Sequence, residues 1–383
     1  MQLPDFYTTV PKTSKQILWK VVPGLVVATA IGMIANLSRI QLGFSSSPFL
    51  HPDFHSTLAA IGSDVPFGKV NLIGAGASFP APLYQRWFVE YNKQNLNVIV
   101  NYQSIGSGAG IEQFTVGTID FGASDRAMTD AEIARVKRGV VLLPMTAGML
   151  TLTYNLPGVK RELKLPRRVY SDIFLGKIRR WNHPQITKAN PGVSLPNLPI
   201  TVLHRSDGGP TTNVFTTHLS AISPEWKSRV GAGVTVPWPV GVGNKGNEGI
   251  AAQILQTRGS IGYVEYAYAK NNNLRMAALE NKAGRYVEPT IESGLRTLST
   301  TLLPQNLRAF IADPQGTDSY PLTAYTWMMA YKNYDDPDKA EAIKAFLRWG
   351  LTEGQKYSRE LGYVPLPQNV VTQVQRAVDT IRP

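Results

Sequence analysis

Three loops of the sequence combine glycine with a hydroxyl side chain at the point where a strand-like segment gives way to a helix-like one. They are Gly76–Pro80, Gly106–Gly110 and Arg205–Thr212. The start of a helix presents unpaired backbone N–H groups and the positive end of the helix dipole, so it attracts anions. Glycine lets the backbone approach a ligand closely, and a hydroxyl adds a further donor. For one loop alone an ordinary helix cap by Ser78 or Ser107 is the commoner outcome, but three such loops in one chain favour an oxyanion site.

The rest of the sequence lacks the signatures of most catalytic and cofactor sites. Its five histidines do not have the spacing of a helical zinc motif, and a chain without cysteine has no thiolate ligand, thiol nucleophile or disulfide. Neither the phosphate-binding loop of ATPases nor the G-x-S-x-G elbow of serine hydrolases occurs. We therefore predict that the protein uses no metal and no cofactor.

A dinucleotide-binding fold is the main alternative from pattern alone, because residues 72–78 (LIGAGAS) run from a strand into a G-x-G sequence. Phe79 stands where that fingerprint requires its third glycine. The following strand-like segment, residues 97–103 (NVIVNYQ), ends without the acidic residue that would hold a ribose. Both departures disfavour the alternative.

The elements that must position these loops alternate between strands and helices. Strands are predicted at residues 69–73 and 97–103, in two runs within 140–156, and at 260–269 and 323–331. A helix after Pro82 carries Leu83, Trp87 and Tyr91 at fourfold spacing, and further helices are predicted within 128–139, at 170–181 and as one long helix over 336–361. This alternation predicts βαβ units and a largely parallel sheet.

The composition is that of a folded protein with a cationic surface. The chain has 383 residues, 43% of them hydrophobic and 17% charged, which fits about two globular domains. The chain has 39 Lys and Arg residues against 27 Asp and Glu residues, so its net charge is +12. Such a charge attracts anions of any kind. No motif that reads nucleic acid accompanies this charge, so we predict no nucleic-acid partner.

The first 40 residues are predicted to be an export signal or an N-terminal membrane anchor. Lys12, Lys15 and Lys20 precede an uncharged run over residues 21–38, a pattern typical of both. The run is at the short end for a membrane span, and no clean cleavage site follows it directly, so cleavage and anchoring both stay open. Residues 41–70, without sustained periodicity, are predicted to be a linker.

Seven long segments of the chain resemble, in the same order, the substrate-binding proteins of bacterial phosphate ABC importers (PstS type). They include GAGASFPAPLYQRWF, IGSGAGIEQF, DFGASD, HRSDGGPTTNVFT and GSIGYVEYAYAKNNNL. The resemblance runs from about Asn71 to near the C-terminus. It implies an α/β fold of two lobes, the periplasmic-binding-protein fold, in which each lobe is a mainly parallel sheet flanked by helices and the ligand lies in the cleft between them. We expect residues 71–149 plus 320–383 in lobe I and residues 150–319 in lobe II.

The same resemblance implies which residues bind phosphate: Ser78, Phe79, Ser107, Asp125, Arg205 and Thr211. The three hydroxyls and the Phe79 amide would donate to the ligand, while the Phe79 ring packs in the core. Asp125 would accept a proton from the ligand, and Arg205, oriented by Asp207, would hold two of its oxygens at once.

The chain departs from the family pattern at Gly209 and Pro210, where Ser-Gly is common. Gly209 lacks the hydroxyl and Pro210 lacks a backbone N–H. We therefore expect two fewer donors at this loop.

The resemblance implies a periplasmic protein that is not an enzyme, which binds inorganic phosphate and delivers it to the permease subunits of an ABC importer. Two alternatives use the same scaffold. One is an extracytoplasmic phosphate sensor or scavenger that feeds no transporter, and the other is a phosphatase-like enzyme. The enzyme is disfavoured because the sequence offers no general base beside a nucleophile and no metal cluster.

Overall fold

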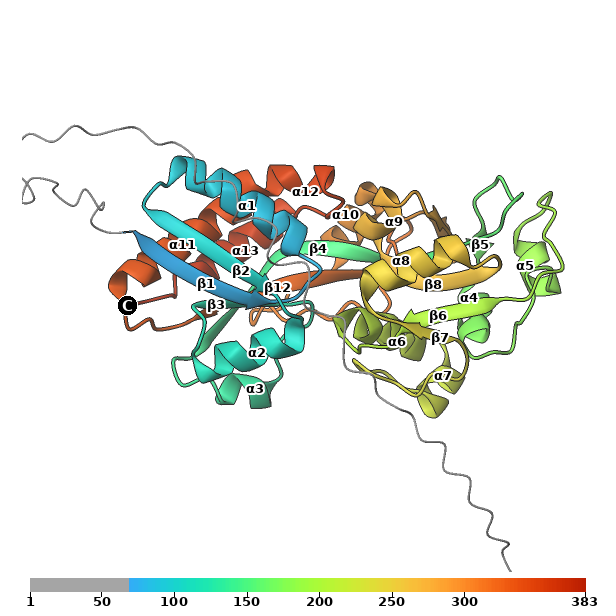
Figure 1. Cartoon of the computed structure of the whole chain (residues 1–383), viewed down its shortest axis with the longest axis horizontal. Coiled ribbons are helices and arrows are strands. Elements are labelled where there is room, and N and C mark those ends of the chain that lie inside the picture. Colours follow the sequence, from blue (N-terminus) through green and yellow to red (C-terminus); the bar gives the residue numbers. More distant parts are fainter. Residues whose placement is uncertain (1–68) are drawn as a thin grey trace, which may run out of the picture. The chain divides into compact units, whose positions relative to one another are not determined.

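A computed structural model describes residues 69–383 (Figure 1). The predicted signal or anchor over residues 1–40, and nearly all of the predicted linker over residues 41–70, lie outside this range. Among the described residues, no helix has both the length and the apolar character that crossing a membrane requires.

The strands and helices alternate along most of the described chain. The strands are β1 (Val70–Gly76), β2 (Val98–Ser104), β3 (Phe121–Ser124), β4 (Val140–Tyr154), β5 (Lys164–Leu165), β6 (Thr201–Arg205), β7 (Val242–Asn244), β8 (Ser260–Glu265), β9 (Arg275–Met276), β10 (Ala278–Glu280), β11 (Tyr286–Val287) and β12 (Thr323–Tyr331). The helices are α1 (Ala81–Gln94), α2 (Ser107–Val116), α3 (Asp130–Ala134), α4 (Arg167–Phe174), α5 (Pro184–Ala189), α6 (Pro210–Ile222), α7 (Pro224–Arg229), α8 (Gly246–Gln256), α9 (Tyr266–Asn271), α10 (Ile291–Thr300), α11 (Pro337–Leu351), α12 (Lys356–Glu360) and α13 (Gln368–Val378).

One mixed sheet of nine strands organises the described chain, in the order β2-β1-β3-β12-β4-β8-β6-β7, with β9 paired to β4. β1 is parallel to β2 and β3, and β6 is parallel to β7 and β8. In the middle of the sheet, β12 is antiparallel to β3 and β4, and β8 is antiparallel to β4. Figure 1 shows α1 and α2 on opposite sides of β1 and β3, and α8 and α6 on opposite sides of β8. The predicted α/β arrangement is therefore present.

β4 is the strand that joins the two ends of this sheet. Its residues Val140–Met149 pair with β12, and its remaining residues Leu150–Tyr154 pair with β8. The prediction of two separate strands within residues 140–156 was wrong. A shift in register between Thr326 and Trp327 leaves Met145 without a partner, and this bulge accommodates Pro144 without ending the strand.

The apolar stripe predicted for the first helix is confirmed, since Leu83, Trp87 and Tyr91 of α1 are buried. The predicted long helix over residues 336–361 is wrong, because α11 ends at Leu351 and a 3₁₀ turn over Glu353–Gln355 precedes α12. The Trp87 indole packs against this break. Its Nε1 donates to the carbonyl oxygen of Gly354 at 2.8 Å, and a Cβ at Gly354 would lie 3.0 Å from the ring.

Two further predicted elements are shorter than expected. The helix predicted over residues 170–181 begins earlier and ends at Phe174, and Gly176 then adopts a left-handed conformation with φ of +74°. The strand predicted over residues 260–269 ends at Glu265, where the backbone N–H donates to Asn247 Oδ1 at 3.2 Å, and α9 begins at the next residue. Glu265 is therefore the last residue of β8.

Candidate functional site

The residues predicted to bind an anion gather around one cleft. A cavity of about 760 Å³ is lined by Ser78, Ser107, Asp125, Arg205, Asp207, Gly209, Pro210 and Thr211. Phe79 lies beside it in a smaller adjoining cavity, which Asp125 and Thr211 also line. The starts of α1, α2 and α6 therefore meet at the same place, although these three helices begin far apart in the sequence.

The first of these helix starts follows a turn that only glycine fits. Gly76 ends β1 with φ of +144°, and a Cβ there would lie 2.1 Å from the carbonyl oxygen of Ala123. Pro80 is the residue before α1, and no side chain caps this helix, so Ser78 is not the ordinary cap that was the alternative. The Phe79 ring is buried, as predicted, and its carbonyl oxygen accepts a hydrogen bond from the Tyr363 hydroxyl at 2.6 Å.

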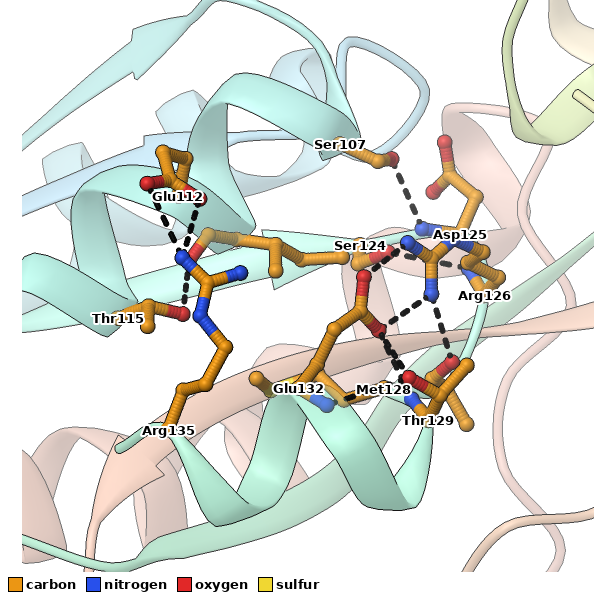
Figure 2. Close-up of polar contacts among 12 residues, drawn as sticks. Ser107, Glu112, Thr115, Ser124, Asp125, Arg126, Met128, Thr129, Glu132 and Arg135 are labelled. Carbon is orange, nitrogen blue, oxygen red and sulfur yellow. Dashed lines mark hydrogen bonds and ion pairs between the residues drawn. The ribbon is translucent and has the colours of Figure 1, made fainter. Parts of the chain in front are cut away.

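Ser107 and Asp125 are joined to each other (Figure 2). Ser107 begins α2 but does not cap it; its Oγ instead accepts a hydrogen bond from the backbone N–H of Asp125 at 3.2 Å. The Thr326 hydroxyl donates to Asp125 Oδ1 at 2.9 Å. Burial raises the pKa of Asp125 well above its ordinary value, against the opposing effects of the Thr326 hydrogen bond and the Arg205 charge. A carboxyl that readily holds a proton thus faces the cleft.

Arg205 is fixed by a paired contact with Asp207. Arg205 Nε and Nη2 donate to the two oxygens of Asp207, each at 2.6 Å, and Nη1 donates to Thr211 Oγ1 at 3.3 Å. Burial would raise the pKa of Asp207, but the hydrogen bonds and charge of Arg205 outweigh it and hold that pKa below its ordinary value. Because a guanidinium has five N–H donors, these three contacts leave two N–H groups for a ligand.

The loop before α6 offers few backbone donors. The Gly209 N–H donates to the carbonyl oxygen of Val234 at 2.6 Å, and Pro210, the first residue of α6, has no N–H. Thr211 and Thr212 follow in the first turn, where backbone N–H groups have no partner within the helix. Thr211 is therefore the first residue of this helix that can donate a backbone N–H to an anion.

Comparison with known proteins agrees with this geometry. The family model described as a PBP superfamily domain matches residues 60–353. The phosphate-binding protein PstS of Pasteurella multocida is 44% identical over 307 residues, which cover 79% of this chain and 88% of that protein. The PstS protein of Methanocaldococcus jannaschii is 39% identical over 331 residues, which cover 80% of this chain and 85% of that protein. The chain belongs to the PstS family of phosphate-binding proteins.

Solved structures show the same fold. A high-affinity periplasmic phosphate-binding protein with bound phosphate superposes with a TM-score of 0.64 at 17% identity, covering 80% of this chain and 93% of its own. A phosphate-binding protein from Stenotrophomonas maltophilia gives a TM-score of 0.62 at 18% identity, with the same coverage. As predicted, the fold is thus the two-lobed α/β periplasmic-binding-protein fold shared by PstS proteins.

Two residues near the site of this PstS family member were not predicted from the sequence. Thr326 lies on β12, and its hydroxyl reaches Asp125 across 201 positions of sequence. Glu265 ends β8 and is 3% exposed, and its Oε1 accepts a hydrogen bond from Thr211 Oγ1 at 3.2 Å. A signal existed for Glu265: it is an acidic residue inside an otherwise apolar run, GSIGYVEYAYA.

Proposed function

We propose that this protein binds one inorganic phosphate ion in the cleft and delivers it to the permease subunits of an ABC importer. One observation carries the proposal: the cleft combines the Arg205 guanidinium and the starts of three helices with Asp125, a carboxyl of raised pKa. Such a site suits a ligand that is anionic and still carries a proton. Inorganic phosphate near neutral pH has both properties, and sulfate lacks the proton.

Each predicted residue has a role in this proposal. The hydroxyls of Ser78 and Ser107 and the amide of Phe79 donate to phosphate from one side of the cleft. Arg205 and Thr211 donate from the other side. Arg205 uses the two N–H groups that remain after its contacts with Asp207 and Thr211, and Thr211 uses its hydroxyl and amide. Asp125 holds the proton that it shares with the ligand, and its charge repels a fully ionised oxyanion when that proton is absent.

Closure of the cleft completes the site. We place residues 71–149 plus 320–383 in lobe I and residues 150–319 in lobe II, so that the chain passes between the lobes near Met149–Leu150 on β4 and again near Tyr320. A cavity of about 760 Å³ exceeds the space that one tetrahedral oxyanion fills. A hinge motion about these passages would bring Arg205 and Thr211 toward Ser78 and Ser107.

The proposed location is the periplasm, with residues 1–40 as export signal or as an anchor that uses residues 21–38. The name and the family of the relatives favour the import role over a sensor or scavenger. A phosphatase on this scaffold has little support, because the relatives of this chain are phosphate-binding proteins.

Titration calorimetry with phosphate and then sulfate tests the binding step. We expect phosphate to bind and sulfate to bind far more weakly, and we expect Arg205→Lys to lose at least about tenfold in phosphate affinity, because a lysine cannot pair two oxygens at once. Equal binding of both anions would refute the proposed specificity. Phosphate uptake into vesicles that contain the permease, with and without this protein, separates import from sensing.

A further inference from the structure

Glu265 is a buried acid at the phosphate site to which none of the roles above applies. It lines the small cavity that adjoins the cleft, together with Phe79, Asp125 and Thr211. Its Oε2 is buried and accepts no hydrogen bond from the described residues. A buried carboxylate oxygen without a partner is unfavourable, and a proton on the group removes much of that cost.

A chain of hydrogen bonds connects this acid to the anion-binding arginine. Arg205 Nη1 donates to Thr211 Oγ1 at 3.3 Å, and Thr211 Oγ1 donates to Glu265 Oε1 at 3.2 Å. A hydroxyl has one hydrogen and two lone pairs. While Thr211 gives its hydrogen to Glu265, it has none to give to phosphate.

We propose that Glu265 is a positioning residue that decides where the Thr211 hydroxyl hydrogen points. When Glu265 carries a proton, it donates that proton to the free lone pair of Thr211 Oγ1. The Thr211 hydrogen then turns to an oxygen of the bound phosphate, so an ionised Glu265 must take up one proton from solvent as phosphate binds. This inference rests on the proposed function, and it makes phosphate binding depend on pH through Glu265.

The groups that face Glu265 favour its protonated form. Burial raises the pKa of Glu265, and the charge of Asp125 raises it further, while Asn247, Arg205 and Thr211 act in the opposite direction. The other titratable groups that face Glu265 are the hydroxyls of Tyr268 and Tyr363, which are neutral near pH 7 and whose own pKa values are raised. The negative charge of a bound phosphate would act in the same direction as Asp125.

The test compares wild type with Glu265→Gln by calorimetry at several pH values, in pairs of buffers with different heats of protonation. The glutamine amide always has N–H groups to donate to Thr211. At pH values where Glu265 of the free protein is ionised, we therefore expect Glu265→Gln to take up one proton fewer than wild type on binding phosphate. Phosphate affinity should fall between about pH 6 and about pH 9 in both proteins. The decrease should be about tenfold larger in wild type than in Glu265→Gln.

Two further variants make the test specific. Glu341→Gln removes an equal charge from an exposed side chain that pairs with Lys344 and lines neither cavity, and it should match wild type in proton uptake. Thr211→Val should bind about tenfold more weakly than wild type at low pH, with the difference vanishing at high pH.

The outcomes separate this inference from the proposed function. If wild type binds no phosphate, the proposed function fails. If wild type binds phosphate but Glu265→Gln keeps its proton uptake and pH dependence, the positioning role of Glu265 is wrong. Should Glu265→Gln not fold, Thr211→Val decides the matter, because an affinity deficit that is the same at every pH contradicts the proposal.

Discussion

Asp125 is the residue at which the site would distinguish one oxyanion from another. Its backbone N–H is held by Ser107 and its Oδ1 by Thr326, so the carboxyl has a fixed direction before any ligand arrives. A fixed carboxylate repels an anion that has no proton to share. A protonated ligand turns the same contact into a hydrogen bond.

Replacing Asp125 with Asn should weaken discrimination more than it weakens phosphate binding. The amide keeps an oxygen that accepts the ligand proton, but it removes the negative charge that repels sulfate. Competition of sulfate with bound phosphate, followed by calorimetry, measures the change. If Asp125→Asn rejects sulfate as strongly as wild type does, the role assigned to the Asp125 charge is wrong.

The loop before α6 should bind phosphate more tightly when it is changed to Gly209→Ser with Pro210→Gly. A Cβ at Gly209 would lie 3.8 Å from Arg205 Nη2, so a serine hydroxyl there can sit beside the guanidinium without a clash. Glycine at position 210 restores a backbone N–H in the first turn of α6. One added bond to a charged ligand is worth about 1.5–3 kcal/mol, so calorimetry should show a gain of about tenfold or more.

Pro210 opposes this gain by holding the helix start in a favourable conformation. The single change Gly209→Ala, which adds the Cβ without the hydroxyl, is the control. Unchanged or weaker affinity in the double variant would mean that neither position points a donor at phosphate.

Single residues were predictable from sequence where their role depends on neighbours in the chain. Ser78 and Ser107 lie directly after a strand and before a helix, so local pattern identified them as candidate donors. The sequence offered a signal for Glu265 but not its contacts, because its partners Thr211 and Asn247 come from two other helices and its place depends on the register of β8 against Leu150.

At the scale of elements, α3 holds the loop that carries Asp125 (Figure 2). Arg126, the next residue, donates to both oxygens of Glu132 at 2.8 and 2.6 Å, and Glu132 also accepts from the Thr129 N–H in a capping box at the start of α3. The Arg126 hydrogen bonds lower the pKa of Glu132 to about 2, although partial burial acts against them. The loop is thereby tied to the helix that follows it.

Replacing Glu132 with Gln should destabilise this loop and weaken phosphate binding. We expect a loss of about 1 kcal/mol in the free energy of unfolding, measured with urea, because a charge-assisted pair becomes a neutral one. A carboxyl whose pKa is lowered in the folded state stabilises at pH values above its unfolded pKa. In wild type this contribution should vanish as the pH falls from about 4 toward 2.

Glu112→Gln is the matched control. Glu112 pairs with Arg135 at 3.2 Å, but both side chains are exposed, and such pairs contribute little. Equal losses of stability and affinity in the two variants would show that the Arg126–Glu132 pair does not position Asp125.

Elements were predictable where one stretch of sequence determines them. The stripe of α1 and the presence of a helix within residues 128–139 follow from local spacing. The end of α11 does not follow from local spacing, because the turn after it contacts a tryptophan 267 positions away in the sequence. β4 likewise continues across Pro144 because β4 bulges at the adjacent Met145, where its register against β12 shifts.

At the scale of the whole molecule, phosphate should shift the protein to a more compact form. The cleft is wide, and the proposed ligand contacts come from both of its sides, so full contact requires closure. Solution scattering with and without phosphate should show a smaller radius of gyration in the bound form. An unchanged profile at saturating phosphate, with Arg205→Lys as the weakly binding control, would contradict the hinge motion.

The position of β12 in the sheet has a consequence for the newly made chain. This strand, near the C-terminal end of the sequence, lies between β3 and β4 and is hydrogen-bonded to both. Until residues 323–331 have been synthesised, the facing edges of β3 and β4 have no partner, and the Tyr331 hydroxyl cannot reach the carbonyl oxygens of Phe114 and Ile119. The sheet around Asp125 therefore forms only after nearly the whole chain has left the ribosome. While β3 and β4 lack this partner, the centre of the sheet is open, and a polypeptide with an open sheet can more easily be threaded through a narrow channel.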